Sequence, residues 1–246
     1  MSGHNKWSTI KRKKGALDSK RSKIFSKIIK DITVAVKEGG NDPDGNARLR
    51  LAIANAKGVN MPKDTLQRAI NKAADKNTAA LTELTFECYA QHGVAVFVEC
   101  LTDNNNRTVS TVRSILNKYG GNLGTNGSLN FIFSRKGVFS IPIENNNPEE
   151  LEMTLIDAGA EEIEQDEGYL TAYCQMEDFS SMQKVLEQSG IEAQSAELQR
   201  IPNTMVSVEL ESAKKILKMI NLLEEDDDVQ AVYHNMEMTD EMMEDE

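Results

Sequence analysis

The sequence lacks the apolar segments that membrane and secreted proteins need. No uninterrupted hydrophobic stretch approaches the roughly 20 residues of a bilayer-spanning helix, and residues 1–15 contain no apolar core of a signal peptide. The three cysteines, Cys88, Cys100 and Cys174, form no short-spaced pair, as expected of reduced thiols. We therefore expect a cytoplasmic protein that does not bind membranes.

Motifs for catalysis, metal binding and nucleotide binding are also missing. His4, His92 and His234 lie far apart, and no C-x-x-C, H-E-x-x-H or G-x-x-x-x-G-K-[ST] pattern occurs. The glycines of 120–124 follow an expected helix and indicate a helix-to-strand turn, because a dinucleotide-binding loop follows a strand. The acidic run 224–228 is interpreted as solvated surface carboxylates. We expect no enzyme, no metal, no cofactor and no small-molecule substrate.

Acidic residues are scarce at one end of the chain. The net charge of −11 argues against nucleic acid if taken as one number. Residues 1–76, however, contain 18 Lys and Arg and 7 Asp and Glu, a net charge of +11, whereas residues 77–246 contain 10 and 32, a net charge of −22. This segregation indicates a basic binding module joined to an acidic body, with phosphate as the expected counterpart of the module.

Helical periodicity follows a dense cationic run at residues 6–14, which is too charged to pack against itself. Apolar residues at helical spacing predict a helix from Asp18 or Ser19 to Gly39–Gly40, with lysines on the face opposite the apolar stripe. Val34 breaks this pattern. Two further helices, one over residues 46–57 and one starting near Pro62, complete an expected three-helix bundle.

The periodicity then changes to that of an α/β protein. The first set of elements comprises strands at 86–89 and 94–101, a helix at 106–119 and a strand at 129–133. The second set has the order βαββαβ of a ferredoxin-like split βαβ unit: 137–142, 148–158, 161–165, 169–175, 178–189 and 192–199. A strand at 205–210, a helix at 212–223 and a strand at 229–233 are expected to return to the first set.

The expected fold class is therefore α+β multidomain: an N-terminal three-helix domain is followed by two α/β domains, the last of which is ferredoxin-like and inserted into the middle one. The boundaries are 1–76 for the basic helical domain, 83–134 plus 204–236 for the discontinuous middle domain, and 135–203 for the inserted domain. Residues 237–246 form an acidic tail that we expect to fray.

The candidate nucleic-acid-binding residues are mostly the cations of the basic module. A lysine-rich helix can merely keep a surface soluble, but residues 1–30 contain ten Lys and Arg and one acid, so ion pairing within the segment is not available. Trp7 fits stacking on an exposed base and burial in the bundle equally well. The predicted contacts are Lys6, Trp7, Lys11, Arg12, Lys13, Lys14, Lys20, Arg21, Lys23, Lys27, Lys30, Arg48, Arg50, Lys63, Arg68 and Lys72.

A series of motifs across essentially the whole chain resembles the YebC/PmpR family. The motifs are Gly3–Trp7, Lys20–Phe25, Asp42–Asp44, Arg48–Ile53, Asn60–Asp64, Gly93–Val96, Glu99–Asn104, Asn106–Thr108, Gly120–Gly124 and Val229–Asn235. The resemblance implies three domains, the first helical, and a probable transcriptional regulator that binds DNA. It also implies a link to translation, because a mitochondrial relative activates synthesis of a cytochrome oxidase subunit and bacterial members are linked to ribosomes. The sequence departs from the family at Tyr89–Gly93, where a glycine- and proline-containing turn is usual, and in a linker without its usual glycine.

We therefore expect a monomeric, nucleic-acid-binding regulator of gene expression. It would be either a transcriptional regulator that binds DNA or a ribosome-associated translation factor that acts through ribosomal RNA. The alternative is a protein-interaction adaptor that docks through its acidic α/β body, while the basic arm only steers the encounter. Nothing in the sequence resembles a recognition helix with base-reading Asn or Gln residues at its start, which favours the ribosome over an operator.

Overall fold

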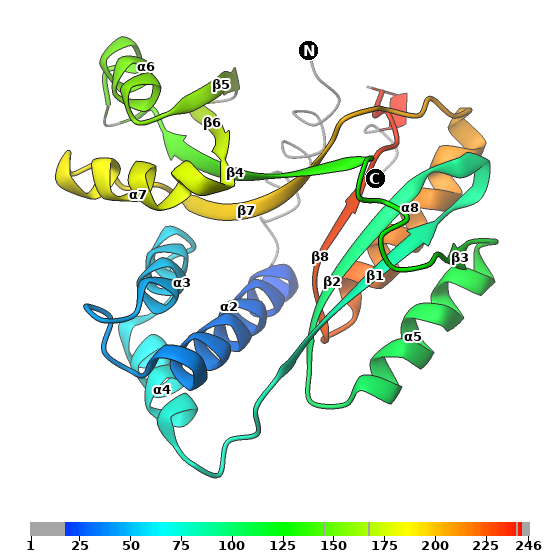
Figure 1. Ribbon diagram of the computed structural model, residues 1–246, viewed down its shortest axis with the longest axis horizontal. Coiled ribbons are helices and arrows are strands. Elements are labelled where there is room, and N and C mark those ends of the chain that lie inside the picture. The colour runs from blue at the N-terminus through cyan, green and yellow to red at the C-terminus, as the bar shows by residue number, and fades with distance from the viewer. Residues whose placement is uncertain (1–17, 145, 167, 240, 243–246) are drawn as a thin grey trace. The chain divides into compact units, whose positions relative to one another are not determined.

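Figure 1 shows the computed structural model of the chain. The structure describes residues 18–144, 146–166, 168–239 and 241–242, with side chains described from residue 21 onward. The described residues divide into two compact units. Unit 1 is drawn from 1–27, 79–134 and 201–246, and unit 2 from 28–78 and 135–200. Each unit contains helices and one four-stranded sheet, so the chain has the expected mixed α+β fold.

The basic part of the chain forms three helices. They are α2 (Asp18–Gly39), α3 (Ala47–Gly58) and α4 (Lys63–Ala74), as the periodicity predicted. Asn46 joins two of them, because its side chain accepts a hydrogen bond from the Leu49 N–H and donates to the carbonyls of Ala35 and Gly40. It therefore caps the start of α3 and satisfies backbone carbonyls near the end of α2.

The second half of α2 is buried on more than one side. Ile32, Ala35 and Val36 are buried as expected, but Val34 is also only 5% exposed. Val34 was noted as breaking the pattern of an apolar stripe opposite the lysines, and its burial shows that the helix is also covered at this position. A single apolar stripe describes a surface helix, whereas this part of α2 is covered around more of its circumference.

In unit 1, two helices cover one face of the sheet. The strands are β1 (Thr82–Tyr89), β2 (Ala95–Thr102), β3 (Asn122–Leu123) and β8 (Val229–His234), in the order β3-β1-β2-β8. Helices α5 (Asn105–Lys118) and α8 (Leu210–Glu225) pack against the sheet through a core that includes Val96, Val98, Leu116 and Ile220. The glycines after α5 form the expected helix-to-strand turn, with Gly120 at φ 74°.

The opposite face of this sheet is covered by a loop. Leu129 and Phe133 are buried against Ala95 and Phe97, and the Phe97 and Phe133 rings meet edge to face at 6.3 Å. Residues 125–132 form turns, whereas the sequence predicted a strand over 129–133. The prediction is wrong for residues 129–132, because Leu129 is buried on the sheet face from within these turns, and a strand begins only at Phe133.

In unit 2, the second sheet carries the ferredoxin-like order of elements. Its strands are β4 (Phe133–Pro142), β5 (Ala160–Asp166), β6 (Tyr169–Gln175) and β7 (Ser195–Pro202), in the order β5-β6-β4-β7. Helices α6 (Pro148–Asp157) and α7 (Phe179–Gln188) share a core with the sheet that includes Phe139, Ile141, Leu155 and Met182.

Helix α3 of the same unit docks on the edge strand β7. The Asn55 side chain donates to the Ala196 carbonyl at 3.0 Å and accepts from the Ala196 N–H at 2.9 Å. Gly58 lies so close to Gln194 that an added Cβ would collide with its carbonyl oxygen. Asn55 thus occupies backbone groups that a further strand would otherwise use.

The C-terminal segment differs from expectation in two places. Residues 205–210 make only an isolated bridge, between Val206 and Met236, and α8 already begins at Leu210. The described part of the tail does not fray, because Met238 and Met242 are 3% and 4% exposed in the core of unit 1. Apolar burial of the methionines outweighs the acidic composition that suggested an open tail.

Candidate nucleic-acid interface

The cationic run at the start of the predicted interface lies outside the described residues. This applies to Lys6, Trp7, Lys11, Arg12, Lys13 and Lys14, and the side chain of Lys20 is likewise outside them. The two interpretations of Trp7 therefore stay open. The remaining predicted residues lie on α2, α3 and α4.

Two lysines of α2 contact the acidic segment between α8 and β8 within unit 1. Lys23 Nζ donates to the Glu225 carbonyl at 3.1 Å, and Lys27 Nζ donates to the Gln230 carbonyl at 3.1 Å. Both acceptors are backbone oxygens. A phosphate approaching these lysines nevertheless meets the carboxylates of residues 224–227 nearby, which weakens this part of the predicted surface.

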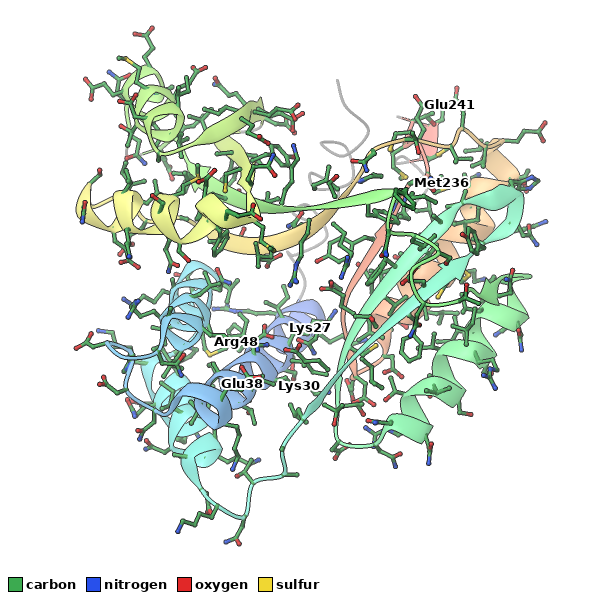
Figure 2. All side chains as sticks on the ribbon, in the orientation of Figure 1. Lys27, Lys30, Glu38, Arg48, Met236 and Glu241 are labelled. Carbon is green, nitrogen blue, oxygen red and sulfur yellow. The ribbon has the colours of Figure 1, made fainter. Side chains whose placement is uncertain are left out.

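Other predicted cations of α2 and α3 have partners within the protein. The Arg21 guanidinium lies 5.4 Å from the centre of the Phe25 ring. Arg48 forms an exposed 2.8 Å ion pair with Glu38 (Figure 2). Arg50 donates to the carbonyls of Pro43 and Asp44, so it holds the loop before α3. Arg50 is therefore a structural residue, which a charge pattern alone does not distinguish from a binding residue.

Helix α4 presents the most open group of predicted cations. Lys63, Arg68 and Lys72 are all exposed, and among the described residues Arg68 donates to acceptors of its own helix, Asp64 O and Thr65 Oγ1. The exposed amides of Gln67 and Asn71 lie on the same helix and bond to each other at 3.0 Å. Asp64 is the one acid of this helix. The exposed side of α4 therefore offers cations and amide groups, and we call Lys63, Gln67, Arg68, Asn71 and Lys72 the α4 face.

The family-like motifs of the middle region converge on one buried carboxylate. Asp228 Oδ2 accepts hydrogen bonds from Thr102 and Thr108 at 3.0 Å each and from Arg107 Nη2 at 2.6 Å. The hydrogen bonds from Arg107 to Asp228, and then to Asp103, raise the pKa of the guanidinium. Asp228 is only 5% exposed, so the interpretation of the run 224–228 as solvated is wrong for its last residue. Nothing in the local pattern distinguishes it, because its partners lie about 120 residues earlier.

Chemistry for metal binding or thiol catalysis is not assembled in the part of the chain that the structure describes. No group of three or more His, Cys, Asp or Glu residues there could hold a metal ion. Burial, and then the charge of Glu87, raise the pKa of the Cys88 thiol to about 12, which makes it a poor nucleophile. None of the described helices is long and apolar enough to cross a bilayer.

Comparison with known proteins decides the family. Residues 5–76 match the model described as "TACO1/YebC protein N-terminal domain", and residues 81–236 match "TACO1/YebC second and third domain". The chain belongs to the TACO1/YebC family. This confirms the resemblance that the motifs indicated.

Relatives in this family align over nearly their whole length. A protein of Amoebophilus asiaticus is 52% identical over 96% of this chain and 98% of its own, and one of Brachyspira hyodysenteriae is 49% identical over 99% and 100%. Each is named a "Probable transcriptional regulatory protein". The crystal structure of a conserved hypothetical protein from Aquifex aeolicus superimposes with a TM-score of 0.82 at 40% identity, covering 91% of this chain and 93% of that one.

The turn between β1 and β2 holds a histidine in a left-handed backbone conformation. Residues Gln91–Gly93 form a single 3-10 turn between β1 and β2, and His92 adopts φ 60°. This left-handed conformation suits glycine better than histidine. The next residue of the turn, Gly93, has φ 76°, which glycine adopts without strain.

Proposed function

We propose that this protein is a non-enzymatic regulator of gene expression that binds nucleic acid through its basic helical part. The observation that carries the proposal is charge segregation: +11 on residues 1–76 against −22 on the rest of the chain. The names of the relatives support a regulatory role. The binding surface is centred on the α4 face and on the cationic run before α2.

The contacts of Lys23 and Lys27 help to rank the predicted cations by their contribution to phosphate binding. Because both lysines touch the segment that carries the acidic run, they contribute less to phosphate binding than Lys63, Arg68 and Lys72. Arg48 and Arg50 contribute least, because one is ion-paired and the other holds a loop. The target is single-stranded or structured RNA, with ribosomal RNA ahead of a DNA operator, because phosphate contacts alone carry no sequence information.

Salt dependence tests the proposal. If about six phosphates are neutralised, log K should fall with log salt at a slope near −5 on duplex DNA and less steeply on single strands. The triple variant Lys63→Glu, Arg68→Glu, Lys72→Glu should lose about three phosphate contacts and flatten the duplex slope by about 3. Fluorescence anisotropy with labelled oligonucleotides at several salt concentrations measures both values.

A matched control separates local binding from total charge. Lys184, Lys215 and Lys218 are exposed lysines of the acidic part, so their replacement by Glu changes the net charge by the same amount. Equal losses in both triple variants, or a wild-type affinity that is independent of salt, would contradict the proposed interface. An adaptor would instead keep its protein partner after deletion of residues 1–30.

A further inference from the structure

A loop of unit 1 joins β3 to β4 (Figure 1), and it presents one aromatic side chain to solvent. Phe131 is 91% exposed, more than any other large hydrophobic side chain among the described residues. Its neighbours Leu129 and Phe133 are 1% and 6% exposed in the small core on the sheet. The loop therefore buries the apolar residues on either side and leaves the central ring free.

A buried carboxylate fixes the first half of this loop. Glu87 is 8% exposed and accepts hydrogen bonds from the backbone N–H groups of Gly127 and Leu129, each at 2.6 Å. The Ser128 hydroxyl donates to the same carboxylate at 3.3 Å. A buried charge with several donors is a strong and directional anchor, so the loop conformation is held by the sheet below it.

Asn203 fixes the second half from the other side. Its side-chain amide donates to the Phe131 carbonyl at 3.1 Å, and its backbone N–H donates to the Ile132 carbonyl at 2.7 Å. Ser134 Oγ also donates to Asn203 Oδ1 at 2.7 Å. With both flanks held, the Phe131 backbone has little freedom to turn the ring inward, and the ring is preorganised for a partner outside the protein.

The loop that carries this ring has no negative charge that would repel a polyanion. Residues 119–134 contain no Asp or Glu, although residues 77–246 carry −22 in total, and residues 198–208 also contain no acid. Two carboxylates of β1 and β2 share the sheet face with the loop. Glu99 lies two residues from Phe97 on β2, about 7 Å along the strand. Glu83 lies four residues from Glu87 on β1, about 13 Å along the strand. The carboxylate of Glu87 itself accepts hydrogen bonds from the loop.

We infer that Phe131 is a stacking platform for an unpaired base of the bound nucleic acid. Every base has a π-face, so an exposed aromatic ring binds single strands with little sequence preference. The exposed side chains of Asn126 and Asn130 on the same loop can add hydrogen bonds to a base edge. This inference rests on the proposed nucleic-acid function and adds to it a contact that does not depend on charge.

The test compares Phe131→Ala with Phe131→Tyr in the full-length protein, using a labelled single-stranded oligoribonucleotide and its duplex. Phe131→Ala should weaken single-strand binding about 5- to 100-fold with an unchanged salt slope, whereas Phe131→Tyr should bind like the wild type. Duplex binding should be unaffected by either change. Met153→Ala, which truncates another exposed apolar side chain (67% exposed), is the matched control.

A second readout reports the contact directly. In a protein with Trp7→Phe and Phe131→Trp, the single indole should lose fluorescence when the oligoribonucleotide stacks on it. Unchanged affinity of Phe131→Ala together with unquenched emission would overturn the inference and assign the ring to a protein partner. The proposed function would still stand in that case if the α4 variant flattens the salt slope. Both proposals fall if the wild type binds neither strand.

Discussion

Both units place two helices on one face of a four-stranded sheet. They differ in the side chain that bonds to backbone N–H and C=O groups not paired between strands. In unit 1 the charged Glu87 holds the backbone of a loop over the open sheet face. In unit 2 the neutral amide of Asn55 holds the backbone of the edge strand β7. A buried carboxylate without its donors is far more costly than an unpaired amide, so unit 1 depends more strongly on its anchor.

The replacement Glu87→Ala should have the largest effect on this comparison. It leaves the N–H groups of Gly127 and Leu129 without an acceptor and should lower the free energy of unfolding by about 3 kcal/mol. Urea unfolding followed by circular dichroism measures this loss. Glu83→Ala, an exposed acid of the same strand, should change stability by less than about 0.5 kcal/mol. A similar, small effect of both variants would show that Glu87 is not the anchor.

Loss of the Glu87 carboxylate should also weaken base stacking on Phe131. With the loop released, Phe131 is no longer preorganised, so Glu87→Ala should weaken single-strand binding even where the protein remains folded. Anisotropy titrations at low temperature, where folding is confirmed by circular dichroism, separate this effect from unfolding. Wild-type affinity in a protein with a mobile loop would argue against preorganisation.

The replacement Asn55→Ala should have a smaller effect in unit 2. One N–H and one carbonyl of Ala196, which is 5% exposed, lose their partner, but the lost hydrogen bonds are between uncharged groups. We expect a loss of about 1–2 kcal/mol in the free energy of unfolding. Lys57→Ala on the same helix is exposed and serves as the control. A loss larger than that of Glu87→Ala would reverse the proposed ranking of the two anchors.

Features that depend on local periodicity were predicted from the sequence, whereas features that depend on distant partners were not. Helices α2 to α4 and the βαββαβ order of unit 2 follow from local periodicity, and each was found within a few residues of its predicted bounds. The loop over residues 125–132 was mistaken for a strand in part, because its apolar residues are held through Glu87, some 40 residues earlier. The burial of Asp228 also depends on partners about 120 residues earlier, which local spacing does not reveal. Long-range contacts, rather than weak local signals, account for these two errors.

The exposure of Phe131 likewise could not be predicted from the sequence pattern. In an alternating strand Leu129, Phe131 and Phe133 would lie on one face, so the sequence pattern predicts that all three are buried together. Only the turns at residues 125–132 place Leu129 and Phe133 inward and Phe131 outward. The candidate cations of α4, in contrast, were identified from charge alone, because a solvated face needs no distant partner.

Ionisation of one buried thiol in each unit should have the smallest effect on stability at neutral pH. Burial raises the pKa of Cys88 to about 12 and that of Cys174 to about 11, with nearby carboxylates adding to both shifts. Unfolded thiols ionise near pH 8.5, so the unfolded state loses its protons first. Stability should therefore be unaffected below about pH 8 and should fall toward pH 11, by at most about 1.4 kcal/mol per pH unit for each thiol.

These thiols also allow the two units to be compared directly. In a Cys100→Ser background, labelling by a thiol reagent at pH 8 requires each site to open, since the closed thiols are both buried and protonated. Peptide mapping by mass spectrometry assigns the labelling rate to Cys88 or Cys174. Glu87→Ala should accelerate labelling of Cys88 well above that of Cys174, and Asn55→Ala should favour Cys174. Equal acceleration at both sites in either variant would mean that the units open together, so that the two anchors stabilise one cooperative structure.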